Sequence, residues 1–289
     1  MKKIRRNMNF LYIPALAVMI CFIIYPLLRG VFISLFQWNG YSQSMKFVGL
    51  KNYLSLFSDK KFVNSFLNTL LYGFGSALLQ NIFGLGLALL VDCKFKTNNL
   101  LRTIVYLPVM VSSLVMGYIM YFFLQYNHGV LNEVLAWFNI EPINWLKDAN
   151  RGKIFITLIN SWQYVGMAMI VYLAGLQNIP TMYMEAAALD GGNWWNVFWH
   201  VTLPLLIPAM TTAVVTNVIG GLKLNDVVIS LTNGGPANKT HSLSTFISYN
   251  YFEMEKAGYA SAIGIFMFVF IYIVSTLLTN FFKRREVQY

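Results

Sequence analysis

Residues 185–208 read EAAALDGGNWWNVFWHVTLPLLIP and connect two uncharged apolar runs, 154–184 and 201–222, that are each long enough to cross a bilayer. The stretch contains two acidic residues and one histidine, and it has neither lysine nor arginine. Cytoplasmic loops of membrane proteins are ordinarily rich in lysine and arginine. A loop that lacks both indicates a protein partner rather than a lipid surface.

The same stretch predicts a helix, a turn and a second helix. Residues 185–189 are strong helix formers, and Pro180 suits the first turn of a helix. Gly191 and Gly192 are expected to end this helix, because glycine tolerates the left-handed conformation found after a helix C-terminus. Pro204 is expected to open the next span. Aromatic side chains recur at helical spacings before it, at Trp194, Trp195, Phe198 and Trp199.

This pattern resembles the EAA loop, which marks the membrane subunits of binding-protein-dependent ABC importers. In that family the loop is a short cytoplasmic helix-turn-helix that docks in a cleft of the ATPase subunit. The position two residues after Asp190 is usually alanine there; here it is Gly192, which leaves the turn intact. The resemblance implies that residues 179–203 form a cytoplasmic coupling loop. It assigns the ATPase-coupling role to Glu185, Ala186, Ala187, Asp190, Gly191, Phe198, Leu203 and Pro204.

The composition places the chain among membrane proteins. Hydrophobic residues make up 57% of its 289 residues and charged residues 11%. Six uncharged runs of at least about 19 residues approach or exceed the length that a helix needs to cross the hydrocarbon. We therefore expect an all-α polytopic protein in which one transmembrane permease domain covers residues 1–289. The resemblance implies the type I ABC importer permease fold. The expected spans are about 10–28, 64–91, 103–124, 154–178, 201–222 and 258–281.

Charge at the two ends predicts the orientation. Four of the first six residues are basic, and Lys283, Arg284 and Arg285 follow the last span. By the positive-inside rule we expect both termini to be cytoplasmic, and an even number of spans requires them to lie on the same side. The chain is expected to be multi-pass in a bacterial plasma (inner) membrane. The net charge of +10 is assigned to lipid headgroups and not to nucleic acid. The two cysteines form neither a disulfide framework nor a metal-ligand spacing.

Two segments outside the loop point to carbohydrate. Residues 47–53, FVGLKNY, and residues 231–236, LTNGGP, are similar to segments of sugar-type permeases. Residues 106–108 and 257–262 also resemble that group. The resemblance implies import of a carbohydrate, most naturally an oligosaccharide. A glycerol phosphodiester or another small polar solute is the alternative substrate.

Polar residues within apolar spans are the candidates for the solute pathway, because burial of an unpaired amide or hydroxyl costs free energy. In maltose-type permeases the spans on both sides of the EAA loop line the sugar pathway. One helical face of the fourth span and a broken polar stretch of the fifth are therefore predicted to contact solute. These residues are Asn160, Gln163, Tyr164, Met167, Asn217, Gly220, Gly221 and Leu224. The competing interpretation is that Asn160 and Asn217 only hydrogen-bond across helices.

The chain has no GxxxxGK[ST] phosphate-binding loop, and no pairing of residue types suited to catalysis is evident. We expect a transport subunit rather than an enzyme, with no cofactor of its own and with ATP and Mg²⁺ bound by partner subunits. The implied partners are a homologous second permease subunit, two cytoplasmic ABC ATPase subunits, an extracytoplasmic solute-binding protein and the lipid bilayer. The implied mechanism is alternating access. The rival interpretations are a self-contained secondary transporter or channel, which would need an intramembrane carboxylate, and an intramembrane enzyme.

Overall fold

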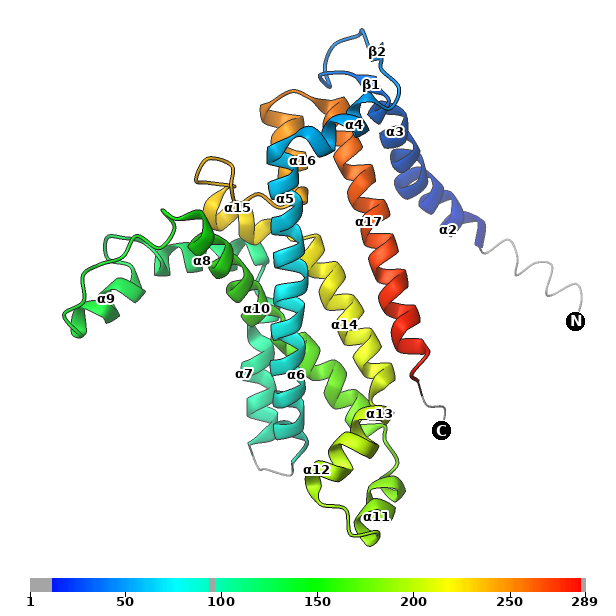
Figure 1. Cartoon of the computed structure of the whole chain (residues 1–289), viewed down its shortest axis with the longest axis vertical. Helices are drawn as coiled ribbons and strands as arrows, with labels where there is room; N and C mark the ends of the chain where they lie inside the picture. The colour runs from blue at the N-terminus through cyan, green and yellow to red at the C-terminus, as the bar shows by residue number, and fades with distance from the viewer. Residues whose placement is uncertain (1–11, 94–96, 287–289) are drawn as a thin grey trace, which may run out of the picture. The chain divides into compact units, whose positions relative to one another are not determined.

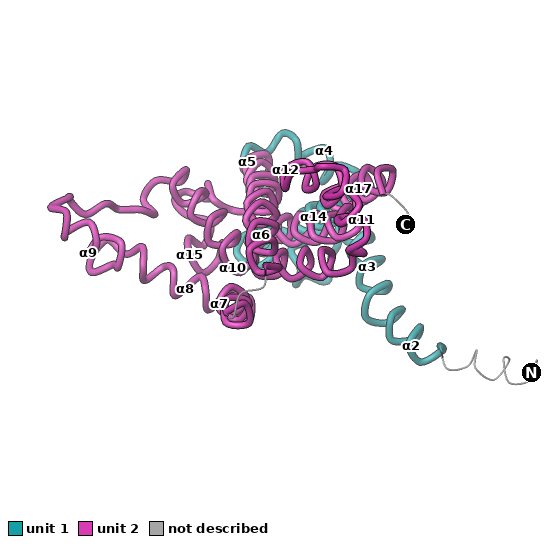
Figure 2. The backbone as a smooth tube through the Cα atoms, turned by 90° about the horizontal axis from the view of Figure 1, so that it is seen from below, with its two compact units in different colours: residues 1–60, 246–269 teal, residues 61–245, 270–289 magenta. Residues whose placement is uncertain are grey.

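The computed structural model describes residues 12–93 and 97–286. Their secondary structure is almost entirely helical, and they cluster into two compact units, residues 1–60 with 246–269 and residues 61–245 with 270–289 (Figures 1 and 2). The basic N-terminal residues and the first two residues of the predicted first span, 10 and 11, lie outside the described residues.

The first unit contains an apolar helical stretch, a small hairpin and a surface helix. Its strands β1 and β2 pair antiparallel, with Phe36 opposite Phe47. Gly258 N–H donates to Trp38 O at 3.1 Å, which fixes the start of α17 against the hairpin. The elements are α2 (Tyr12–Met19), η2 (Ile20–Ile24), α3 (Tyr25–Ser34), β1 (Phe36–Gln37), β2 (Lys46–Phe47), α4 (Lys51–Ser58), η5 (Tyr249–Glu253) and the first part of α17 (Ala257–Lys283).

The second unit is built around the long helix α10 (Ala149–Gln177), which packs against α6, α7 and α14. Asp148 begins α10 by accepting a hydrogen bond from Arg151 N–H. The other elements are α5 (Lys60–Leu70), η3 (Leu71–Gly75), α6 (Ser76–Asp92), α7 (Asn98–Met110), α8 (Ser113–Phe123), α9 (Val130–Trp137), α11 (Thr181–Leu189), α12 (Trp194–Val197), η4 (Phe198–Thr202), α13 (Leu203–Leu205), α14 (Ile207–Leu222), α15 (Asp226–Thr232) and α16 (Leu243–Ser248).

Four continuous helical stretches of the described residues are long and apolar enough to cross a membrane: Tyr12–Ser34, Lys60–Asp92, Ala149–Gln177 and Ala257–Lys283. Two bent helix pairs bring the number to as many as six. The expected all-α architecture with up to six spans is therefore confirmed.

The predicted span at 103–124 corresponds to two helices, α7 and α8, with a break between them. α7 and α8 meet at an angle of 96°. Pro108 removes a backbone donor near the end of α7. Val111 is extended and Ser112, with a ψ of 133°, is not helical, so the helical hydrogen bonds stop there.

The fifth predicted span, 201–222, is also bent, by 68° between residues 194–205 and 207–222. The straight helix α14 begins at Ile207 and carries Pro208 in its first turn. Pro204 lies in the short α13 before the bend, and so it does not open the long span as the sequence suggests. The sequence pattern placed the start of the long helix at Pro204 because Pro204 and Pro208 both suit a helix N-terminus.

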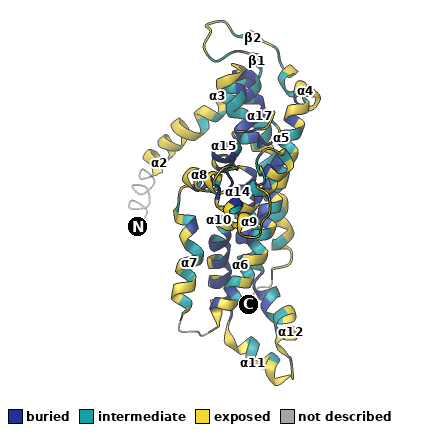
Figure 3. Cartoon of the chain, turned by 90° about the vertical axis from the view of Figure 1, so that its left-hand side faces the viewer, coloured by how far each residue is buried: buried dark blue, intermediate teal, exposed yellow. Residues whose placement is uncertain are grey.

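Small residues allow helices of the second unit to cross at close range. A Cβ on Gly84 of α6 would lie 2.6 Å from the Ala168 Cβ of α10, whereas a Cβ on Gly86 would meet nothing within 4 Å. A Cβ on Gly221 of α14 would lie 2.8 Å from the Cα of Gly73, which belongs to η3 just before α6. The helix pairs α6–α10 and η3–α14 are thus in close contact. Buried residues concentrate on α10 and α6, whereas α2, α11 and α12 are largely exposed (Figure 3).

Candidate functional site

The predicted coupling loop is a helix-turn-helix, as the sequence indicates. Its first helix, α11, covers Thr181–Leu189, and Pro180 precedes it in an extended conformation. Gly191 has a φ of +79°, and Gly192 N–H donates to Ala187 O at 3.0 Å. This left-handed residue with its returning hydrogen bond ends the helix in the way expected of glycine. Asn193 then caps α12 by accepting from Asn196 N–H at 2.9 Å.

The outer surface of the loop is apolar and exposed. Leu189 is 89% exposed, and Trp194 and Trp195 are 60% and 61% exposed. Trp194 stacks on Phe198 with the ring centroids 5.4 Å apart, so the aromatic surface is held together. Glu185 is exposed and forms no ion pair within the described part of the chain. A rigid apolar surface with an available carboxylate is suited to docking a partner.

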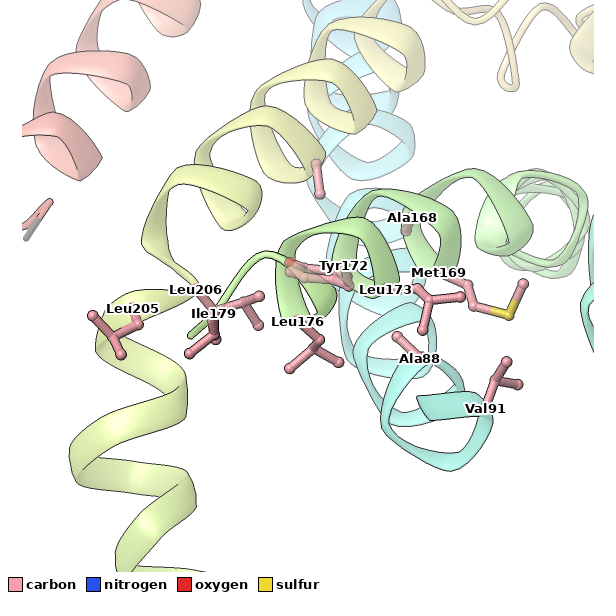
Figure 4. Close-up of a cluster of buried hydrophobic side chains, with 11 residues drawn as sticks. Ala88, Val91, Ala168, Met169, Tyr172, Leu173, Leu176, Ile179, Leu205 and Leu206 are labelled. Carbon is pink, nitrogen blue, oxygen red and sulfur yellow. The ribbon is translucent and has the colours of Figure 1, made fainter. Parts of the chain in front are cut away.

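The base of the loop rests on a buried apolar cluster shown in Figure 4. Ile179, Leu205 and Leu206 meet residues from α6, α10 and α14 there, and Tyr183 and Val201 of the loop pack against its edge. Tyr172 also belongs to the cluster and donates its hydroxyl to Asn81 Oδ1 at 2.7 Å. The base of the loop is therefore packed into the same cluster as parts of α10 and α14.

Seven of the eight predicted pathway residues line one cavity of about 390 Å³ between α6, α8, α10 and α14. This volume lies within the usual range of small-molecule sites. The seven are Asn160, Tyr164, Met167, Asn217, Gly220, Gly221 and Leu224. The wall also contains Thr216, Lys223, Asn225 and Asp226.

Gln163 is the predicted pathway residue that does not line the cavity. It is fully buried, and its Nε2 donates to Val111 O at 3.0 Å, at the bend between α7 and α8. Helical periodicity misplaced Gln163 because a spacing of three residues puts it about 60° around the helix from Asn160. That rotation is enough to turn its side chain towards α7.

Sequence reasoning did not select Gln80 and Ser113, which also line the cavity. Ser113 Oγ and the Tyr164 hydroxyl lie 2.7 Å apart, and Gln80 Nε2 donates to Asn160 O at 3.0 Å. The polar character of Gln80 within a long apolar run was a signal that could have singled it out. The position of Ser113 depends on the bend after Met110, which the sequence did not predict.

Two buried polar atoms of the cavity residues have no hydrogen-bond partner within the described residues: Gln80 Oε1 and Asn217 Nδ2. Gln80 is 2% exposed and Asn217 is 7% exposed. Leaving a buried donor or acceptor unpaired costs about 1–3 kcal/mol. Both residues line the cavity, although these two atoms themselves have under 1 Å² of accessible surface.

A second polar region holds the segment that follows α15. Asn68 Nδ2 donates to Lys239 O and His241 O, at 2.8 and 2.9 Å, and the Tyr72 hydroxyl donates to Thr240 O at 2.9 Å. His241 Nδ1 lies 3.0 Å from Thr245 Oγ1. Burial, assisted by the charge of Lys61, lowers the pKa of His241 to about 4, so that its imidazole is neutral at neutral pH.

Residues 80–287 match the family model described as binding-protein-dependent transport system inner membrane component. The chain belongs to this family. It is therefore a permease, an inner-membrane transport subunit and not a catalytic enzyme, which confirms the family and the role expected from the loop at 185–208.

Relatives of this permease agree with the assignment. It is 31% identical to the probable starch degradation products transport system permease protein AmyD of Thermoanaerobacterium thermosulfurigenes, over 95% of this chain and 93% of that one. It is 33% identical to the trehalose/maltose transport system permease protein MalF of Thermococcus litoralis, over 90% and 88%. Its fold matches a chain of a bacterial ABC transporter involved in import of the acidic polysaccharide alginate, with a TM-score of 0.84, 23% identity and 98% coverage of both chains.

Proposed function

We propose that this permease conducts a carbohydrate, most naturally an oligosaccharide, inward through the cavity between α6, α8, α10 and α14. The observation that carries the proposal is the lining of this cavity, in which amides and hydroxyls of Gln80, Ser113, Asn160, Tyr164 and Asn217 surround one space. Amides and hydroxyls hydrogen-bond sugar hydroxyls in the same way. The transport of starch products, trehalose and maltose by relatives about a third identical supports the same solute class.

The charges at the cavity favour an uncharged solute. Lys223 and Asp226 both line it and are both exposed, so one positive and one negative charge offset each other. An anionic solute such as a glycerol phosphodiester would meet a cavity without net positive charge, which makes it the weaker candidate. An ion-coupled secondary transporter would use a carboxylate deep in its apolar helices. Within the described spans, the wall of this cavity has no such carboxylate.

The energy for transport is assigned to partner subunits. The exposed loop surface of Glu185, Leu189 and Trp194 would dock in a cytoplasmic ABC ATPase that binds ATP and Mg²⁺. The other coupling residues proposed from the resemblance lie on the same short loop. Closure of an ATPase dimer would move the loops of two permease subunits, and the apolar cluster at the loop base would pass that movement to α10 and α14. The cavity would then open alternately to the two sides of the membrane.

The remaining assembly follows from the same proposal. A homologous second permease subunit would complete the pathway, and an extracytoplasmic solute-binding protein would deliver the sugar. One related structure, similar in fold, is of the alginate transporter in complex with a pentasaccharide-bound periplasmic protein. Both termini of this chain would lie in the cytoplasm, on the side of the coupling loop.

Sugar uptake by a gene-deletion strain tests the proposal. Deletion of the gene for this chain should abolish uptake of at least one of radiolabelled maltose, trehalose and lactose, and a wild-type copy should restore it. A copy that encodes Asn217→Leu should insert at normal levels and restore much less. Undiminished uptake of all polar solutes tested, or restored uptake that needs no ATP, would contradict the proposal.

A further inference from the structure

We propose that Lys61, Lys153 and Lys239 form a cationic surface on which acidic side chains of the extracytoplasmic solute-binding protein dock. The inference rests on the proposed importer function and deepens it, because it names the residues that recognise this partner. The three lysines, called the lysine cluster below, come from distant parts of the second unit. They lie at the start of α5, at the start of α10 and in the segment between α15 and α16.

Asn64 of α5 connects the members of the lysine cluster. Its Oδ1 accepts from Lys153 Nζ at 3.5 Å, and its Nδ2 donates to Lys239 O at 2.9 Å. Lys61 precedes Asn64 by three residues on α5, so both lie on the same face of that helix. The charge of Lys61 also acts on His241, two residues after Lys239. Three distant segments thus present their lysines on one surface.

Positive charge accumulates on this surface. Lys61 and Lys239 are exposed, and Lys153 is half-buried. Neither Lys153 nor Lys239 forms an ion pair within the described part of the chain. Lys239 lies near enough for its like charge to act on the Lys153 ammonium. Like charges repel each other, so a partner that brings carboxylates to this surface relieves the repulsion.

The lysine cluster and the coupling loop lie at opposite ends of α10. This helix is continuous from Ala149 to Gln177, so Lys153 lies about 36 Å along its axis from the end that leads into the loop. That distance exceeds the hydrocarbon thickness of about 30 Å. With the coupling loop in the cytoplasm, the lysine cluster faces the extracytoplasmic side. Lysines at span ends are ordinarily concentrated on the cytoplasmic side, so a cluster at the outer ends indicates a specific partner.

The position of the lysine cluster beside the cavity identifies that partner. Ser242, three residues after Lys239, donates its Oγ to Leu224 O at 2.6 Å. Leu224 lines the cavity after the end of α14 that is remote from the coupling loop. The segment that carries Lys239 is therefore bonded to the outer part of the cavity wall, where a solute-binding protein must release its solute. Complementary charges between two proteins speed their encounter and fix their orientation.

The experiment measures sugar uptake into proteoliposomes that contain the assembled transporter and ATP. The solute-binding protein added is the one whose gene deletion abolishes uptake of maltose, trehalose or lactose by the wild-type strain. We expect Lys239→Glu to raise the half-saturating concentration of this protein about 10-fold at about 50 mM salt, and less than about 3-fold at about 500 mM, because salt screens exposed charges. The double variant Lys61→Glu, Lys239→Glu should raise it about 30-fold or more. The maximal rate of uptake should stay within about 2-fold of wild type, because the cavity and the coupling loop are unchanged.

Lys147→Glu is the matched control, because it makes the same charge change at an exposed lysine outside the lysine cluster. It should shift the half-saturating concentration less than about 2-fold, and Lys239→Arg, which keeps the charge, should behave like the wild type. Lys61→Glu alone provides the same test if Lys239→Glu fails to assemble with its partners.

Three results would overturn the docking surface. They are equal shifts in Lys239→Glu and Lys147→Glu, a shift that salt does not reduce, and a shift seen only in vesicles that contain anionic lipid, which would identify headgroups as the ligand. Each of these leaves the importer function standing. Wild-type uptake that needs no solute-binding protein would instead contradict the importer function, and the docking surface with it.

Discussion

The coupling loop and the cavity are opposite in character. The loop exposes apolar side chains, with Leu189 at 89% and both tryptophans at about 60%, whereas the cavity buries polar ones, with Gln80 at 2% and Asn217 at 7%. Each arrangement is unfavourable in an isolated chain, because apolar surface prefers to leave water and buried polar atoms prefer a partner. The proposed function accounts for both, with an apolar protein surface covering the loop and a hydroxyl-rich solute occupying the cavity.

The two regions are also joined. Residues 179, 205 and 206 at the loop base share one buried cluster with α10 and α14, which line the cavity. A variant of the loop should therefore affect assembly and transport together, whereas a variant of the cavity should affect transport alone.

The largest effect is expected at the turn of the coupling loop. Gly191 has a φ of +79°, which proline cannot adopt, so Gly191→Pro should disrupt the turn and reduce uptake at least about 100-fold. ATPase subunits should no longer co-purify with the variant, although it still inserts into the membrane. Gly191→Asn is the matched control, because asparagine tolerates the left-handed region, and it should retain most activity. Normal co-purification and uptake by the proline variant would show that this loop is not the docking element.

The contact between α6 and α10 provides the next test. Gly84→Leu would place a side chain where the Ala168 Cβ already lies 2.6 Å away, so the helices must separate. We expect this variant to lose about 3 kcal/mol or more of stability, measured as a lower melting temperature in detergent, and to transport poorly. Gly86 lies two residues further along, and a Cβ there would meet nothing within 4 Å. Gly86→Leu should therefore change the melting temperature and the transport rate little. Equal effects of the two variants would contradict the close crossing.

A smaller effect is expected at Asn160. Asn160→Leu removes a cavity amide and its hydrogen bond to Ser76 Oγ, and it should lower uptake about 10-fold while ATPase co-purification stays normal. Loss of ATPase association together with uptake would mean that the cavity and the loop are not separable.

The smallest effect expected is on the pH dependence of stability, and it concerns His241, which lies in neither the coupling loop nor the cavity. Since the folded-state pKa of His241 is about 4, below the usual 6.5, its neutral form stabilises the fold fully above pH 6.5 and this contribution is lost as the pH falls towards 4. Between pH 7.5 and pH 5 the loss should be about 1–2 kcal/mol, seen as a lower melting temperature. His241→Asn should remove this part of the pH dependence, and replacement of the exposed His128 by asparagine should not. An unchanged pH profile in His241→Asn would contradict the buried neutral imidazole.

Sequence reasoning predicted those features that depend on local chemistry. The helix of residues 181–189, its end at Gly191 and the apolar spans follow from propensity and hydropathy, and the structure has them at nearly the expected residues. Features that depend on packing between distant segments were missed. The bend at Val111–Ser112 places Ser113 in the cavity wall, and the crossing of α6 with α10 and α14 brings Gln80 and Asn217 to the same cavity. Gln163, in contrast, was predicted to line the cavity from its spacing, but its Nε2 donates to Val111 O at the bend.

The central claim is that the cavity is a solute pathway driven through the coupling loop, and thiol labelling of Asn217→Cys tests it most directly. The variant is made in a chain with Cys21→Ser and Cys93→Ser, because both native cysteines are exposed. A small hydrophilic thiol reagent should label Cys at position 217 in at least one nucleotide state, and a saturating concentration of the transported sugar should slow that labelling about 10-fold or more. Labelling that is absent in every nucleotide state, or that proceeds at the same rate with and without sugar, would show that Asn217 joins helices and that the solute passes elsewhere.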